Sequence, residues 1–181
     1  LNNFNNLELK KKALGNCKNK KLKFNDDKFN SGHSSIVSER ESNESFSRKI
    51  TVNTLDSQVF KYNKIKVVKI DVEGYEKHIL NGCKKLLENN KVRYWIVEYA
   101  PHCLAKYGEN ISSIKDLFRK YGYDMFILDP NCSLPKFIPT NTVIHSKAIP
   151  NILFTKMESI NKDWLFEDLS NHINPRNLFK P

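Results

Sequence analysis

Near its middle, the chain has a β-branched segment that ends in acids and turns on one glycine into an amphipathic segment. Residues 69–76 read Lys-Ile-Asp-Val-Glu-Gly-Tyr-Glu. The apolar residues before this point are typical of a buried strand, and those after it recur at helical spacing. Ligands of open α/β sheets bind in the crevice at the carboxyl ends of the strands. The sequence therefore predicts a binding site at this strand-to-helix junction.

Strand and helix patterns alternate along the rest of the chain. This alternation predicts an α/β fold with right-handed crossovers and a mostly parallel sheet. We expect one domain over residues 1–156 and an amphipathic tail over residues 157–181 that packs against the sheet. The predicted strands cover residues 7–13, 20–24, 50–55, 65–72, 93–99, 125–128 and 151–156, and the predicted helices follow residue 55 and cover residues 75–89 and 113–121.

Three acids and a lysine gather at two of the predicted strand ends. Asp71 and Glu73 follow one strand, and Glu98 ends the next strand along the chain. A charge on a buried strand is costly unless it is paired, so Lys69 is expected to meet Glu98 across the sheet and to organise the site. Asp71 is the first candidate for a general base, and an N-cap of the following helix is its equal alternative.

Two further polar residues have both a functional and a structural interpretation. His33 lies in a polar loop, and a histidine can take up a proton at neutral pH. The alternative is that His33 is an inert, solvent-exposed loop residue. Glu76 lies in the first turn of the predicted helix, where the helix dipole favours an anion. For Glu76 we prefer the structural role.

The cysteines and the hydropathy pattern indicate a protein of a reducing compartment. The 4 cysteines are far apart and form no Cys-x-x-Cys pair, which argues against disulfides and against a zinc or dithiol site. A His-Glu-x-x-His pattern is not present either, so no metal site is predicted. No apolar run approaches the roughly 18 residues that a membrane-spanning helix needs. We expect a cytoplasmic protein.

The formal net charge of +10 raises the question of a nucleic-acid partner. Lysines cluster near the start of the chain, and such a patch can bind phosphates. Asparagine accompanies lysine throughout, however, and the stacking aromatic motif of an RNA-binding module is not present. We therefore expect a small-molecule partner, and a basic module that binds nucleic acid or anionic glycans remains an alternative.

The central segment resembles the FkbM-type family of S-adenosylmethionine-dependent methyltransferases. The hallmark of that family is Lys-x-Asp-x-Glu-Gly-x-Glu, followed by a hydrophobic pair, one residue and a glycine. Further family landmarks are similar in kind and order, and the resemblance covers roughly residues 1–156. The hallmark positions are filled here by Lys69, Asp71, Glu73, Gly74, Glu76, Ile79, Leu80 and Gly82.

The resemblance implies a Rossmann-like class I methyltransferase sheet and transfer of a methyl group to a hydroxyl of a sugar or another small molecule. The candidate catalytic residues for this reaction are Asp71, Glu73, Glu98, Lys69 and His33, the last in a loop that the resemblance places near the acceptor pocket.

It also implies a glycine-rich turn that binds S-adenosylmethionine after the first strand of the sheet. The 6 glycines of this chain do not form such a turn. We therefore expect an incomplete sheet that lacks the first strands, in the C-terminal part of a methyltransferase domain without the N-terminal half that binds the cofactor. Such a chain alone is expected to be inactive, and a non-catalytic remnant is the alternative.

Overall fold

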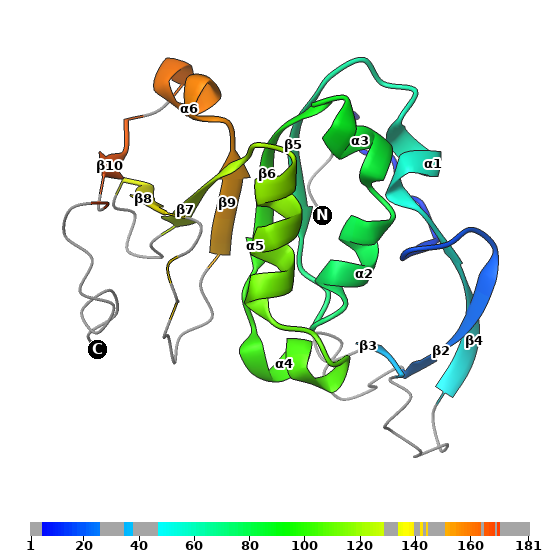
Figure 1. The fold of residues 1–181 in the computed structure, drawn as a ribbon. Helices are drawn as coiled ribbons and strands as arrows, with labels where there is room; N and C mark the ends of the chain where they lie inside the picture. Colours follow the sequence, from blue (N-terminus) through cyan, green and yellow to red (C-terminus); the bar gives the residue numbers. More distant parts are fainter. Residues whose placement is uncertain are drawn as a thin grey trace.

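The computed structural model describes residues 5–25, 35–37, 47–128, 134–139, 142, 144, 151–163, 165–168 and 170. These residues form two β-sheets and the helices that pack beside them (Figure 1). The smaller sheet has four strands in the order β1 (Ala13–Leu14), β4 (Ser47–Asn53), β2 (Lys20–Asn25) and β3 (Ser35–Ile36). The larger sheet has six strands in the order β10 (Glu167–Asp168), β8 (Lys136–Ile138), β7 (Asp124–Leu128), β9 (Asn151–Thr155), β6 (Val92–Glu98) and β5 (Ile65–Ile70).

The larger sheet is mixed. The pairs β5–β6 and β10–β8 run parallel, whereas β6–β9, β7–β9 and β7–β8 run antiparallel. The α/β class is therefore confirmed, but a mostly parallel sheet does not describe these strands. The reason is that β9, which follows β7 and β8 in sequence, inserts between β6 and β7 and runs against both. The strands before residue 54 do not join this sheet, and they form the smaller one instead.

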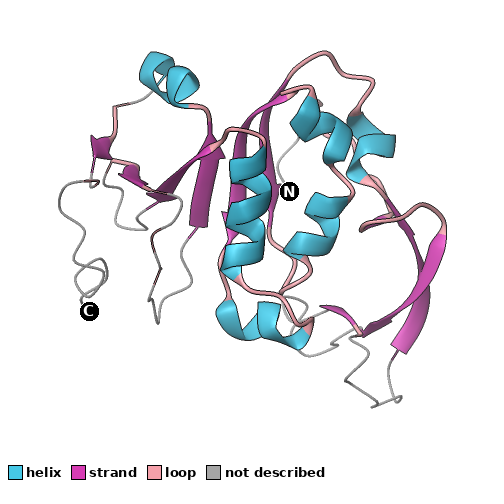
Figure 2. Ribbon diagram, viewed as in Figure 1, coloured by secondary structure: helices cyan, strands magenta, loops and turns pink. Residues whose placement is uncertain are grey.

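Side chains alternate between the two faces of the sheet, and each face has its own apolar cluster. Trp95 of β6 packs edge-to-face on Phe118 in the larger cluster, with ring centroids 5.8 Å apart. The next residue toward the N-terminus, Tyr94, belongs to a second cluster that includes Ile160. Figure 2 shows the helices beside the strands that they cover. The helices are α1 (Leu55–Val59), α2 (Glu76–Asn81), α3 (Lys84–Glu88), α4 (Pro101–Lys106), α5 (Ile111–Lys120) and α6 (Met157–Asp163).

The helix expected over residues 75–89 is two helices, because the chain breaks at Gly82. A Cβ atom on Gly82 would lie 2.1 Å from the carbonyl oxygen of Gly15, so this position is in close contact with the smaller sheet. The Asp56 carboxylate then accepts hydrogen bonds from the backbone N–H groups of Lys85 and Leu86, at 2.9 and 3.1 Å. It thereby satisfies donors that the first turn of α3 leaves unpaired.

The remaining details concern helix starts and the tail. Thr54 caps α1, and Asn110 caps α5. Pro101 is the first residue of α4, where its missing N–H costs nothing. Of the tail over residues 157–181, the described part forms α6 and β10, and its division from the domain stays a prediction.

The described residues offer neither a membrane-spanning helix nor a metal-binding cluster. None of their helices has the length and apolar character that a membrane crossing requires. Among the same residues, no three His, Cys, Asp or Glu side chains are grouped so that they could hold a metal ion.

Candidate active site

The acids predicted from the sequence lie together at the carboxyl ends of two neighbouring strands of the larger sheet. β5 and β6 are parallel neighbours, and Ile70 lies opposite Val97 in their register. The residues that follow, Asp71 and Glu98, therefore lie side by side at the carboxyl ends of the two strands. Their side chains are close enough to share a hydrogen bond. Two carboxyls can do this only when one of them is protonated, so Asp71 and Glu98 can hold one proton between them.

Lys69 pairs with Asp71. Its Nζ atom donates to Oδ2 of Asp71 at 2.5 Å, and the two side chains are 44% and 45% exposed. The direct ion pair between Lys69 and Glu98 that the sequence predicts does not form. Lys69 affects Glu98 only through its charge. An ion pair this exposed contributes about 0–1 kcal/mol to stability. We infer that its main effect is to orient the Asp71 carboxylate.

The N-cap interpretation of Asp71 is wrong. The N-cap residue of α2 is Tyr75, and no side chain makes a capping hydrogen bond there. Glu76 instead holds the turn before the helix, because its Oε1 atom accepts from the backbone N–H groups of Val72 and Gly74, both at 3.2 Å. Glu76 is 1% exposed, and burial raises its pKa. This geometry supports the structural role that the sequence favoured for Glu76.

Glu98 is the carboxyl of the site whose pKa is raised toward neutral pH. Burial, and next the nearby charge and hydrogen bond of Asp71, raise the pKa of Glu98 to about 7. Glu73 adds to the rise and Lys69 opposes it. Two carboxylates that share one site cannot both ionise easily, so one of them keeps its proton to higher pH. A carboxyl that titrates near neutral pH can both accept a proton and return it.

The turn between β5 and α2 is tightly constrained. Glu73 and Gly74 both have left-handed backbone angles, with φ of 54° and 101°. A Cβ atom on Gly74 would lie 2.2 Å from the carbonyl oxygen of Cys103, so the turn is in direct contact with α4. The Cys103 thiol also donates to Oε2 of Glu73, at 3.2 Å. A left-handed backbone at a residue other than glycine costs about 1–3 kcal/mol, and such strain clusters at functional sites.

Two neighbours of the site were not assigned a role from the sequence. Asn151 lies opposite Glu98 in the β6–β9 register, and its Oδ1 atom is buried without a hydrogen-bond partner in the part of the chain that the structure describes. Cys103 reaches Glu73 from α4, and burial together with this hydrogen bond raises its pKa to about 11, so the thiol stays protonated. From the sequence, Asn151 was only the first residue of a predicted strand, and no helix was predicted over residues 101–106, which begin with a proline. His33 lies outside the described residues.

Comparisons with known proteins bear on this site. A family model for the methyltransferase FkbM domain matches residues 2–125. No curated protein and no solved structure matches the chain. The matched range includes β5, β6 and the constrained turn, and it covers well over half of the sequence. The chain therefore belongs to the FkbM methyltransferase domain family.

Proposed function

We propose that Asp71 and Glu98 are the proton-accepting pair of an O-methyltransferase that methylates a hydroxyl of a sugar or another small molecule. The observation that carries this proposal is the pKa of Glu98, about 7, beside Asp71 at the carboxyl ends of β5 and β6. An alcohol holds its proton about as tightly as water, whose pKa is about 15.7. The proton must therefore leave as the new C–O bond forms. General-base help of this kind contributes about 10²–10⁴-fold in rate.

The charge of the site is consistent with S-adenosylmethionine as the methyl donor. Asp71, Glu73 and Glu98 bring three carboxyls together against the single ammonium of Lys69. A sulfonium is positively charged, so a group of carboxylates attracts it. When bound, S-adenosylmethionine supplies an electrophilic methyl group. Asp71 and Glu73 would face its positive charge, and Glu98 would take the proton of the acceptor hydroxyl.

We also propose that another strand pairs along β5 in the active enzyme and completes a Rossmann-like sheet. β5 is an edge strand of the larger sheet, and β6 is its one partner among the described residues. Val67 of β5 is 46% exposed. An open edge with an exposed apolar side chain is ready to pair with another strand. The added strand would bring the glycine-rich cofactor turn, which the sequence of this chain does not contain.

Transfer of a labelled methyl group from S-adenosylmethionine to hydroxylated small molecules tests these proposals. We expect transfer by an enzyme form that carries the added strand and glycine-rich turn, and none by this chain alone. The label should survive mild alkali, because a methyl ether is stable there and a methyl ester is not. Alkali-labile or nitrogen-bound label would contradict a hydroxyl acceptor. Transfer by this chain alone would contradict the proposal about the added strand.

A further inference from the structure

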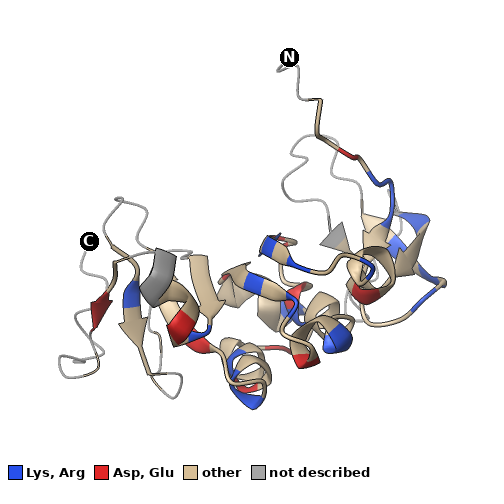
Figure 3. Cartoon of the chain, turned by 90° about the horizontal axis from the view of Figure 1, so that it is seen from above, with Lys and Arg blue, Asp and Glu red and all other residues tan. Residues whose placement is uncertain are grey.

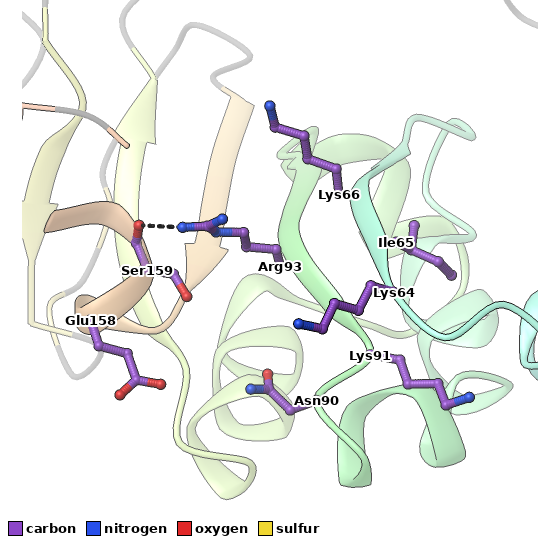
Figure 4. A pocket seen from close by; sticks show the side chains of 8 residues that line it. All are labelled: Lys64, Ile65, Lys66, Asn90, Lys91, Arg93, Glu158 and Ser159. Atoms are coloured by element: carbon purple, nitrogen blue, oxygen red, sulfur yellow. Dashed lines mark hydrogen bonds between the residues drawn. The ribbon is translucent and has the colours of Figure 1, made fainter. Parts of the chain in front are cut away.

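A polar cavity lies at the other end of β5 and β6 from the acids. It has a volume of about 560 Å³ and opens between α6 and the starts of β5 and β6 (Figure 4). Its charged lining residues are Lys64, Lys66, Lys91, Arg93 and Glu158. Four cations thus surround the cavity with one carboxylate. Basic residues also gather near the N-terminus, outside this cavity (Figure 3).

Two of these lysines are available to a ligand. In the view of Figure 4, the Lys64 side chain lies between those of Arg93 and Asn90. The Lys66 side chain lies on the other side of Arg93 from Lys64. Both residues are exposed, and within the described ranges neither ammonium has a hydrogen-bond or ion-pair partner. Lys91 differs, because its Nζ atom donates to the carbonyl oxygens of Phe60 and Tyr62, at 2.8 and 3.1 Å.

The other polar groups of the cavity are held in place by contacts behind them. The Tyr123 hydroxyl donates to Oδ1 of Asn90 at 3.0 Å, which leaves the NH₂ of that amide as a donor toward the cavity. Asn90 also has a left-handed φ of 48°. On the opposite wall, Arg93 donates to the carbonyl oxygen of Ser159 at 3.3 Å and so ties β6 to α6. The cavity is therefore lined by positioned donors as well as by exposed lysine side chains.

We propose that this cavity binds a small ligand that carries phosphate, through the ammonium groups of Lys64 and Lys66 and the amide NH₂ of Asn90. Gathered cations repel one another, and an anion between them removes that repulsion. Phosphate offers several acceptor oxygens for such donors, and charge-assisted hydrogen bonds are the strong ones. A volume of about 560 Å³ lies within the range of small-molecule sites. The inference does not depend on methyl transfer, because the acids lie at the other ends of β5 and β6.

Isothermal titration calorimetry with inorganic pyrophosphate tests this proposal. We expect saturable binding to one site, and a loss of roughly tenfold or more in affinity for the double variant Lys64→Gln/Lys66→Gln. The matched control is Lys18→Gln/Lys84→Gln, which removes the same charge from exposed positions outside the cavity. Its affinity should stay close to that of the unchanged protein. Thermal melts of both variants check that the fold is retained.

Three results would overturn the proposal. One is an equal loss of affinity in the two double variants, which would mean diffuse surface charge. Another is a titration in which pyrophosphate binding does not saturate. This result would overturn the proposal even if a single-stranded oligonucleotide bound to the protein. The third is citrate binding as tight as that of pyrophosphate, which would remove the preference for phosphate. Each of these outcomes leaves the methyl-transfer proposal untouched, so the two can fail separately.

Discussion

Replacing Glu98 by Gln is expected to lower kcat for methyl transfer by about 10²–10⁴-fold in the active enzyme, because the amide cannot accept the proton of the acceptor hydroxyl. Affinity for S-adenosylmethionine should change little, since the proposed role of Glu98 concerns the acceptor. The wild-type rate should fall as the pH drops below about 7, where Glu98 becomes protonated. Steady-state kinetics over a pH series measures both effects.

Asp71→Asn separates the two members of the pair. Removing the neighbouring charge lowers the pKa of Glu98, so the acidic limb of the pH profile should move to lower pH. Asp116→Asn is the matched control, because Asp116 is an exposed carboxylate that pairs with Arg119 at 2.8 Å on α5. It should leave the profile in place. An unchanged kcat for Glu98→Gln would mean that another group takes the proton.

Gly74→Ala is expected to destabilise the fold by about 2–5 kcal/mol. One part of the loss comes from the φ of 101° at Gly74, which an alanine adopts only under strain. The larger part comes from the new Cβ atom, which would lie 2.2 Å from the backbone oxygen of Cys103. A backbone atom cannot swing aside as a flexible side chain can. The strand-to-helix turn or α4 must therefore shift, and the acids move with the turn.

Gly122→Ala is the control for this substitution. Its φ is 72°, and the nearest atom to an added Cβ is the Nζ of Lys156 at 3.9 Å, so only backbone strain is introduced. We expect a loss of about 1–2 kcal/mol there. Urea unfolding of both variants gives the two free energies. Equal losses would show that the close contact between Gly74 and α4 does not limit stability.

Local sequence patterns predicted the elements around the site well. β5, β6, α5 and β7 lie close to their expected ranges, because each combines a clear apolar period with nearby turn or capping residues. The grouping of Asp71 and Glu98 also followed from the sequence, since parallel strands bring their carboxyl ends to one edge. Which acid would titrate near neutral pH did not follow. That depends on burial and on the direction of Lys69, and both are tertiary properties.

Long-range contacts explain the errors. The break at Gly82 is set by Gly15, which is far away in sequence and contacts it through backbone. The cap of α3 comes from Asp56, whose spacing from Lys85 no local motif encodes. Likewise, β9 was expected as a strand over residues 151–156, but not that residues 152–155 would lie fully buried between β6 and β7. Its place in the sheet is decided by pairing partners that a linear pattern does not reveal.

Asp71 and Glu98 form one acidic site at the carboxyl ends of β5 and β6, in which burial and Asp71 raise the pKa of Glu98. A carboxyl ¹³C NMR titration of Glu98, in the unchanged protein and in Asp71→Asn, tests it without any substrate. We expect a midpoint of about 7 in the unchanged protein and a clearly lower one in Asp71→Asn. A midpoint near the ordinary glutamate value of about 4.3 in both proteins would contradict it.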